Sequence, residues 1–322
     1  MSNPSVAFPR LKSAQDWHNL VNTPLGKNMT LSDLFNARVV CYKELEAIRG
    51  RPLLIYCVRF VVPKGVGNSI DLQDIEGFTD LVNSINHSDS VDVLIHSPGG
   101  SADVTERIVN ILSTKFKEVH YLIPHSAYSA ATMLALSGDS ITIHPSATLG
   151  PIDPQIDGIP ARSIKRGFEN AKTKIKDEGP QSLPAYVPLI QKYTLHLLEI
   201  CEDAEKLSKE LVGDWLKAKM LKGKDEAEIN KVVEYFSAYD KHLTHSRPLF
   251  YNKIKDYGLN ISVPDKKVQE LMWEIHLLVS GFLNGSPFYK LYENAHGISW
   301  GRQLLLNNTQ PVPQTPQDPQ QN

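Results

Sequence analysis

Two short segments of the chain combine glycine, serine and small side chains in a way that suits acyl-transfer chemistry. The first, HSPGG, spans residues 96–100, and the second, AYSAAT, spans residues 127–132. Glycines such as Gly99 and Gly100 can adopt positive φ and let a substrate approach bare backbone amides. The Gly100 amide can then donate to a developing oxyanion, while Ser129 supplies a hydroxyl nucleophile. Together the two segments predict a serine hydrolase site.

Ser129 stands directly before a run of small residues that can form a closely packed helix. A helix N-terminus stabilises negative charge, so we expect the Ala130 amide to be the second oxyanion donor. Ser126 is a rival nucleophile one turn earlier. Candidate substrate contacts in or next to the two segments are Ser97, Gly99 and Ser126. Either segment alone is typical of a packing turn, so the prediction depends on their combination.

Alternating strands and helices must bring the two segments together. Apolar, branched and aromatic runs predict buried strands at residues 53–62, 91–97, 118–124 and 140–145. Helical spacing of apolar residues predicts intervening helices at residues 72–85, 104–112 and 129–137. This alternation indicates an α/β fold with βαβ crossovers and a mainly parallel sheet. Because such sheets bind ligands beyond the carboxyl ends of their strands, both segments should lie at that edge.

Composition divides the chain into four regions. Residues 1–38 are polar and interrupted by prolines, which predicts an N-terminal arm, and residues 39–265 form the α/β domain. Residues 266–306 are expected to be a C-terminal helical extension. Residues 307–322 are rich in Pro and Gln, which predicts a disordered tail.

The overall composition excludes several function classes. Of 322 residues, 41% are hydrophobic and 22% are charged, which is typical of a globular chain. The 34 Lys and Arg residues nearly balance 36 Asp and Glu residues, so no basic excess favours nucleic-acid binding. Three isolated cysteines and the spacing of the histidines indicate neither metal nor cofactor. With no signal or membrane-spanning segment recognised, we expect a cytoplasmic protein with buried, reduced thiols.

Longer segments around the two motifs resemble the serine dehydrogenase proteinase family, which belongs to the Clp peptidase and crotonase superfamily and is related to signal peptide peptidase A. The likeness covers roughly residues 39–265. It rests on the segments VDVLIHSPGG (91–100), AYSAATMLALSGDSI (127–141), SATLGPIDPQI (146–156) and LTHSRPLFYNKIKDYGL (243–259). The resemblance implies a Clp/crotonase-like spiral of repeated ββα or βαβ units. It also implies serine peptidase chemistry, with Ser129 as nucleophile and the Gly100 and Ala130 amides as the oxyanion hole.

The resemblance leaves the general base open. Signal peptide peptidase A uses a lysine beyond the corresponding turn, and Lys165 follows LGPIDPQ here, so it is the first choice. His245 is an alternative base, although it also suits a cap of the following helix. Asp153 is interpreted as a turn-forming residue and not as a triad acid. A neighbouring subunit could also supply the base, and the further candidates in this chain are Lys172, Lys174, Lys176 and Lys192.

The leading hypothesis is an ATP-independent serine endopeptidase that cleaves peptides or unfolded protein segments through an acyl-enzyme. Its glycine segment would hold the substrate as an added strand. Two alternatives are a catalytically inactive pseudo-peptidase that acts as an oligomeric binding scaffold, and a crotonase-like thioester-processing enzyme. We expect a homo-oligomer, because helices at residues 188–238 and 265–283 offer apolar stripes for packing between subunits. No nucleic acid, membrane span or particular partner protein is indicated.

Overall fold

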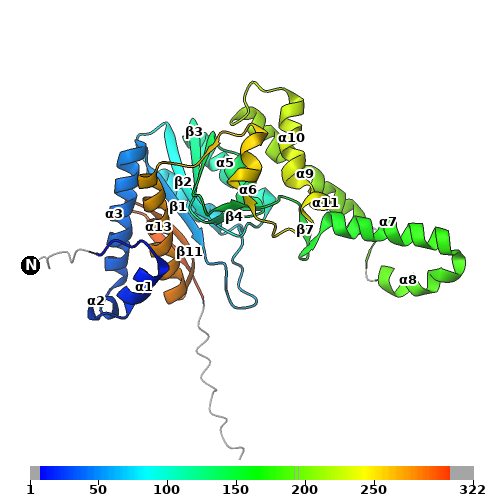
Figure 1. The fold of residues 1–322 in the computed structure, drawn as a ribbon, viewed down its shortest axis with the longest axis horizontal. Helices are drawn as coiled ribbons and strands as arrows, with labels where there is room; N and C mark the ends of the chain where they lie inside the picture. Colours follow the sequence, from blue (N-terminus) through cyan, green and yellow to red (C-terminus); the bar gives the residue numbers. More distant parts are fainter. Residues whose placement is uncertain (1–7, 192, 195, 305–322) are drawn as a thin grey trace, which may run out of the picture.

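Branched and aromatic side chains form the strands at the centre of the molecule (Figure 1). In this computed structural model, the described residues 8–191, 193–194 and 196–304 contain a central sheet of seven strands. Along the sheet these strands are β10 (Ile261–Ser262), β5 (Ser140–Ile143), β3 (Glu118–Ile123), β2 (Ser90–His96), β1 (Leu53–Val58), β11 (Phe288–Asn294) and β12 (Ser299–Gln303). The strands from β10 to β1 run parallel, whereas β11 and β12 pair antiparallel. The predicted α/β class with a mainly parallel sheet is confirmed.

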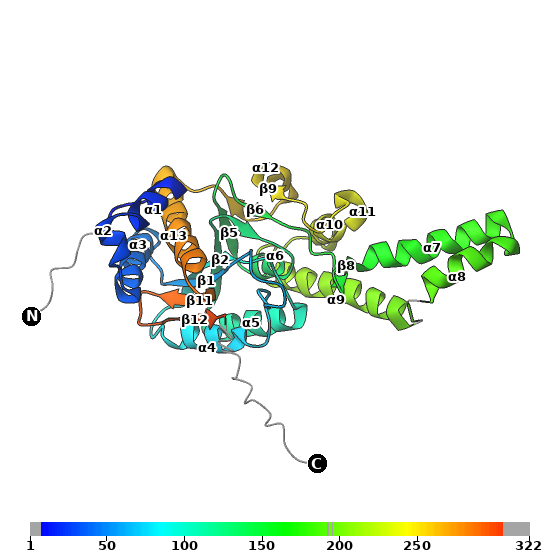
Figure 2. The same cartoon turned by 90° about the horizontal axis from the view of Figure 1, so that it is seen from below.

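Helices cover both faces of this sheet. They are α3 (Leu31–Arg49), α4 (Asp74–Asn83), α5 (Ala102–Lys115), α6 (Ala130–Leu136), α9 (His196–Ala218), α10 (Glu226–Ser237) and α13 (Lys266–Gly285). Figure 2 shows α3 and α13 on one face and α4 and α5 on the opposite face. Side chains of β1 alternate between the two cores: Tyr56 packs with the α4 side and Ile55 with the α3 side. This double coverage explains why β1 is apolar along its whole length.

A small second sheet lies beside the turn that carries Ser129. In the described chain it comprises β4 (Ser126–Ala127), β6 (Thr148–Leu149) and β9 (Leu249–Phe250), with β6 in the middle. Nearby short elements are the hairpin of β7 (Gln155–Ile156) and β8 (Ile159–Pro160) and the helices α11 (Tyr239–His242), α12 (Tyr251–Ile254) and η2 (Lys255–Tyr257). The LGPID and THSRP segments therefore meet next to Ser129, although they are far apart in sequence.

The N-terminal region is helical, in contrast to the expected irregular arm at residues 1–38. α1 (Ala14–Val21) and α2 (Pro24–Lys27) precede α3, and α1 packs against α13. Ser13 and Thr30 begin α1 and α3 with capping boxes, in which each side chain and an acidic residue satisfy free amides reciprocally. These signals override the prolines that suggested an arm.

The C-terminal region also differs from the purely helical extension expected at residues 266–306. After α13, strands β11 and β12 form a β-hairpin that joins the central sheet next to β1. Charged residues interrupt the apolar pattern of β11, so the sequence did not indicate a strand there. These residues can be buried because their charges are paired inside the core. Lys290 Nζ lies 2.9 Å from Asp74 Oδ2, and Glu293 Oε1 lies 2.6 Å from Arg38 Nη2. The tail predicted at residues 307–322 lies outside the described residues.

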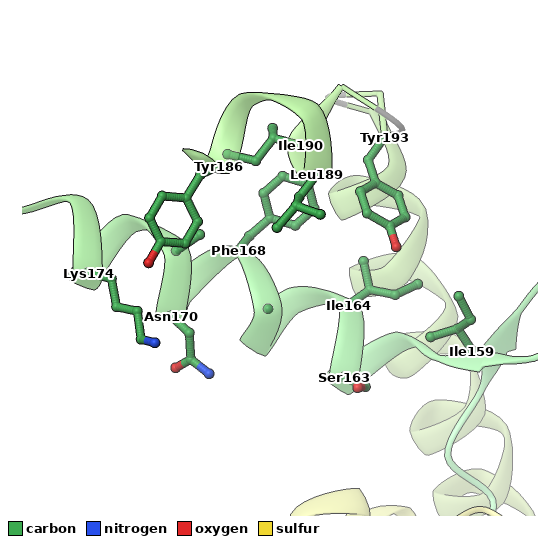
Figure 3. Close-up of a pocket in the computed structure, with 12 residues that line it drawn as sticks. Ile159, Ser163, Ile164, Phe168, Asn170, Lys174, Tyr186, Leu189, Ile190 and Tyr193 are labelled. Carbon is green, nitrogen blue, oxygen red and sulfur yellow. The ribbon is translucent and has the colours of Figure 1, made fainter. Parts of the chain in front are cut away.

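A helical hairpin, residues 161–190, extends away from the body in both views (Figures 1 and 2). It consists of α7 (Ala161–Glu178), η1 (Pro180–Ser182) and α8 (Leu183–Ile190). Within the described chain no residue of α8 is buried, although its sequence LPAYVPLI is apolar. A cavity of about 400 Å³ lies on this hairpin, and Figure 3 shows Phe168, Leu189 and Tyr193 around it. The hairpin therefore presents apolar side chains that the other described residues do not cover.

The apolar stripe of α13, which the sequence suggested for subunit packing, is instead part of the core beneath the sheet.

Among the described helices, none has both the length and the apolar content needed to cross a lipid bilayer.

A cluster of histidines occupies the ends of β2, β3 and β5 next to α13. The ring centroids of His96 and His125 each lie 4.8 Å from that of His276, and the His144 ring lies 5.4 Å from that of Trp273. Burial lowers the pKa of all four imidazoles, and it lowers the pKa of His276 to about 3. The cluster therefore packs as neutral aromatic rings at neutral pH.

We expect this cluster to make the folded protein acid-sensitive. His276 binds its proton at about pH 3 in the folded state, whereas an unfolded histidine does so near 6.5. Acidification through this window favours the unfolded state, so stability present above pH 6.5 should fall by about 2 kcal/mol at pH 5 from this group alone. Urea unfolding of wild type and His276→Gln at pH 7.5 and 5.0 measures the effect. Equal pH dependence in the two proteins would contradict the assignment.

Candidate active site

Ser129 occupies the turn between β4 and α6 in a rare backbone conformation. Its φ is 52° and its ψ is −123°. A positive φ is unfavourable for a residue with a Cβ, and it persists only where the surrounding structure enforces it. Sharp strand-to-helix turns of this kind present nucleophilic serines in other hydrolase folds. The conformation is a second observation, independent of the sequence motif, that singles out Ser129.

The glycine loop lies directly against this turn. A Cβ added to Gly99 would lie 2.7 Å from the Ser129 Cβ and 2.9 Å from the Ala130 amide nitrogen. The φ of Gly99 is 100°, so both space and backbone conformation require glycine here. The two loops are also bonded to each other, because Ser97 N donates to Ser126 O and Tyr128 N donates to Ser97 O, each at 3.1 Å. The predicted meeting of the two segments is therefore present.

The Gly100 amide is directed away from the neighbouring strand residue Ile70. Ile70 N donates to Gly99 O at 2.6 Å, and Ser101 N donates to Ile70 O at 2.9 Å. In such a parallel bridge, the intervening residue points its own amide to the opposite side. In the described part of the chain, no hydrogen bond outside the regular elements uses the Gly100 amide. It remains available as a donor to a bound group.

A cavity of about 490 Å³ opens over these residues. It brings together five of the site residues expected from the sequence: Gly99, Gly100, Ser129, Ala130 and His245. Further parts of the wall are contributed by α5, α6, α9 and the loop that follows β6, through Asp103, Met133, Leu207 and Ile152, respectively. The volume is sufficient for a few residues of an extended peptide.

Two candidate substrate contacts lie beneath the cavity and not in it. Ser97 is fully buried, and its hydroxyl accepts a hydrogen bond from the Gly99 amide at 3.2 Å. Ser126 is also buried, and its hydroxyl lies 2.8 Å from His125 Nδ1. Neither Ser97 nor Ser126 is among the described residues that line the cavity. Their side chains support the two loops from below.

His245 reaches the cavity with a buried carboxylate behind it. Its Nδ1 lies 3.0 Å from Asp153 Oδ1, and only 3% of the Asp153 side chain is exposed. The two atoms are close, although their alignment falls outside hydrogen-bond geometry, and neither Asp153 oxygen has another hydrogen-bond partner among the described residues. Asp153 is thus a buried carboxylate directly beside the His245 ring. This contact was not expected from the sequence.

The LGPID segment is fastened to the Ser129 turn, which explains how Asp153 is positioned. A Cβ at Gly150 would lie 2.3 Å from the Tyr128 ring, and the Gly150 amide donates to Thr132 Oγ1 at 3.0 Å. Since no described hydrogen bond involves the Asp153 side chain, its interpretation as a turn-forming residue is not supported. A signal was present in the sequence, because this acidic residue belongs to the most specific of the resembling segments.

Lys165 is placed unfavourably for a general base. Its Nζ donates to Glu205 Oε2 at 3.0 Å, and this hydrogen bond raises the pKa of the lysine. A raised pKa keeps the ammonium charged at neutral pH, whereas a base must be neutral. Of the candidate lysines that the structure describes, none lines the Ser129 cavity. The others named in the sequence lie on α7, except Lys192, which is outside the described residues.

The described residues contain no group of three or more His, Cys, Asp or Glu side chains arranged to hold a metal ion. Cys41, Cys57 and Cys201 are unpaired and buried. Burial raises the pKa of the Cys41 thiol to about 12, so this thiol is protonated at neutral pH.

A family model and several known proteins are similar to this chain. A family model of ClpP-like SDH-type serine proteinases matches residues 24–278. An uncharacterized protein of Methanocaldococcus jannaschii is 31% identical over 242 residues, which cover 73% of this chain and 75% of that protein.

Solved ClpP structures are similar at lower identity. The ClpP catalytic domain from Plasmodium falciparum is 15% identical with a TM-score of 0.40, covering 74% of this chain and 94% of that one. ClpP1 from Listeria monocytogenes is 13% identical with a TM-score of 0.39, covering 70% and 98%.

The matched family region contains the glycine loop, the Ser129 turn, the LGPID segment and the His245 block. It covers most of the chain, and the resemblance found in the sequence is confirmed. The chain belongs to the family of ClpP-like SDH-type serine proteinases.

Proposed function

We propose that this protein is a serine peptidase in which Ser129, His245 and Asp153 act as a catalytic triad. The observation that carries the proposal is the position of His245, which lines the Ser129 cavity while its Nδ1 lies 3.0 Å from the buried Asp153. The proposal replaces Lys165 as the base, because Lys165 is paired with Glu205. The nucleophile Ser129, the orienting acid Asp153 and the base His245 then follow one another in this order along the chain.

The mechanism follows from these positions. The Ser129 hydroxyl attacks the scissile carbonyl carbon while His245 Nε2 accepts the hydroxyl proton, because Nδ1 faces Asp153. The oxyanion of the tetrahedral intermediate accepts hydrogen bonds from the Gly100 and Ala130 amides. His245 returns the proton to the leaving amine, and an acyl-enzyme forms on Ser129. Water activated by His245 then hydrolyses this ester and restores the serine.

The substrate is proposed to be an extended peptide or an unfolded protein segment, cleaved internally without ATP. Ile70 occupies one edge of the Gly99–Ser101 segment through its two backbone hydrogen bonds. A substrate strand must therefore lie on the opposite side, towards which the Gly100 amide points. Backbone pairing of this kind depends little on side chains and admits many sequences.

We expect a fluorophosphonate probe to label the wild-type protein and Ser126→Ala but not Ser129→Ala. The Ser129 hydroxyl is at the cavity, whereas the Ser126 hydroxyl is bound to His125 beneath it. Intact-protein mass spectrometry detects the covalent adduct, and circular dichroism establishes that each variant is folded. A folded wild type that takes no label would favour the inactive scaffold, and a labelled Ser129→Ala would place the nucleophile elsewhere.

A second experiment identifies the base. His245→Ala should lower kcat for a peptide substrate by about 10³- to 10⁴-fold, and Asp153→Asn should act in the same direction because it misorients the imidazole. Lys165→Met should stay close to wild type, since it removes only a contact with Glu205. Steady-state kinetics on the three variants measures these effects. A loss in Lys165→Met with an active His245→Ala would reverse the assignment.

We also propose that the protein forms a homo-oligomer through its helical hairpin. α8 exposes apolar side chains on a projection that contributes little to the body (Figure 2). Burial of such side chains between copies is favourable by roughly 25 cal/mol for each Å² removed from water. A cavity on the hairpin, lined by Phe168, Tyr186 and Leu189, offers a place for an apolar residue of the partner (Figure 3).

The hairpin contact can be tested with matched substitutions. Leu189 on α8 and Leu31 at the start of α3 are each 60% exposed. If the hairpin joins the copies, Leu189→Lys should lower the molar mass measured by light scattering, whereas Leu31→Lys should leave it at the wild-type value. A monomeric wild type, or dissociation by Leu31→Lys alone, would reject the hairpin as the contact.

A further inference from the structure

A second cavity, of about 550 Å³, adjoins the Ser129 cavity at the N-terminus of α5. The two cavities share Ser101 and Asp103 as lining residues. The second one is also lined by Asp71, Gln73 and Tyr289. A peptide that lies extended over Ser129 and continues past the start of α5 therefore enters it. Asp103 stands at the point where the peptide passes from one cavity to the other.

Asp103 carries an uncompensated charge at this point. It is exposed, and the described part of the chain gives it neither an ion pair nor a side-chain hydrogen bond. Asp103 lies in the first turn of α5, where the helix dipole favours an acidic residue. The dipole does not explain why this acidic residue lies between two cavities. A cationic side chain of a bound peptide could therefore form an ion pair with it.

Other acidic side chains lie near Asp103 at the second cavity. Asp71 and Asp74 share the single ammonium of Lys290, which is fully buried, so this group as a whole remains negative. Arg302 lies near the second cavity, where it donates to Gln73 O, but it is paired with Glu76 at 2.7 Å. Of the described residues that line the two cavities, none is Lys or Arg.

Apolar side chains also line the Ser129 cavity. They include Met133 of α6, Ile152 and Leu207 of α9, and the Leu207 side chain is 40% exposed. The cavity thus combines an acidic residue of α5 with apolar residues of other elements. A peptide with an apolar residue on one side of Ser129 and a basic residue on the other side matches both kinds of lining residue.

We propose that Asp103 is a specificity-determining residue that makes the Ser129 cleft prefer peptides with Lys or Arg on the α5 side of the scissile bond and an apolar residue on the α9 side. This inference rests on the proposed peptidase function and adds a substrate class to it. An ion pair at such an exposed position corresponds to about a fivefold preference. The preference decreases with salt, because exposed charges are screened.

The test uses peptides that differ only in one position, which is Lys, Gln or Glu, scanned over both sides of an apolar residue. For the wild type, kcat/KM should be about fivefold higher for the best Lys peptide than for its Glu counterpart. Asp103→Asn should bring this ratio close to one. Glu106→Gln, which removes an exposed acid from the same helix away from both cavities, should keep the wild-type ratio. A purely structural role of Asp103 would change both peptides alike and leave the ratio intact.

Binding to the Ser129→Ala variant separates this inference from the proposed function. Fluorescence anisotropy of the labelled Lys and Glu peptides reports the charge preference without cleavage. A Lys preference that Asp103→Asn abolishes supports the inference even if the wild type cleaves no peptide, which would reject the peptidase proposal alone. Equal binding of both peptides, or a ratio unchanged by Asp103→Asn, would overturn it.

Discussion

The close approach of Gly99 to the Ser129 turn is the contact on which the candidate site depends. Only a glycine fits where a Cβ would lie 2.7 Å from that of Ser129. The contact aligns two backbone segments from neighbouring parallel strands, and hydrogen bonds through Ser97 fix their register. In return, the strained φ of Ser129 is maintained by a loop that has no room for another conformation. The backbone amides of Gly100 and Ala130 are therefore positioned by contacts between backbone segments and not by flexible side chains.

Two kinds of histidine environment lie near this contact. His245 lies beside the buried carboxylate of Asp153. Among the described residues, the cluster around His276 forms no ion pair with a carboxylate, and burial lowers the pKa of its imidazoles. The same residue type thus lies beside an acid in one place and packs as a neutral aromatic ring in the other. Histidine spacing in the sequence could not separate these roles, because the neighbours that decide them come from distant segments.

The sequence predicted most of the fold because buried parallel strands are continuous apolar runs. It missed β11, since Lys290 and Glu293 interrupt that pattern and find their partners on α4 and α3. For the site, the glycine loop, Ser129 and His245 were named in advance, and the structure places them at one cavity. Lys165 was preferred from its position after a turn, but local spacing could not reveal its contact with Glu205. The roles of all these residues in catalysis stay predictions.

The β11–β12 hairpin ties the end of the described chain to its beginning. Glu293 pairs with Arg38 of α3, and only 2% of the Arg38 side chain is exposed. Arg38 and Glu293 are 255 residues apart in the sequence, so a ribosome synthesises Arg38 long before its counter-charge. Removing one partner of a buried ion pair strongly destabilises a fold. The core between α3 and the sheet is therefore electrically balanced only once β11 has been synthesised and has joined the sheet.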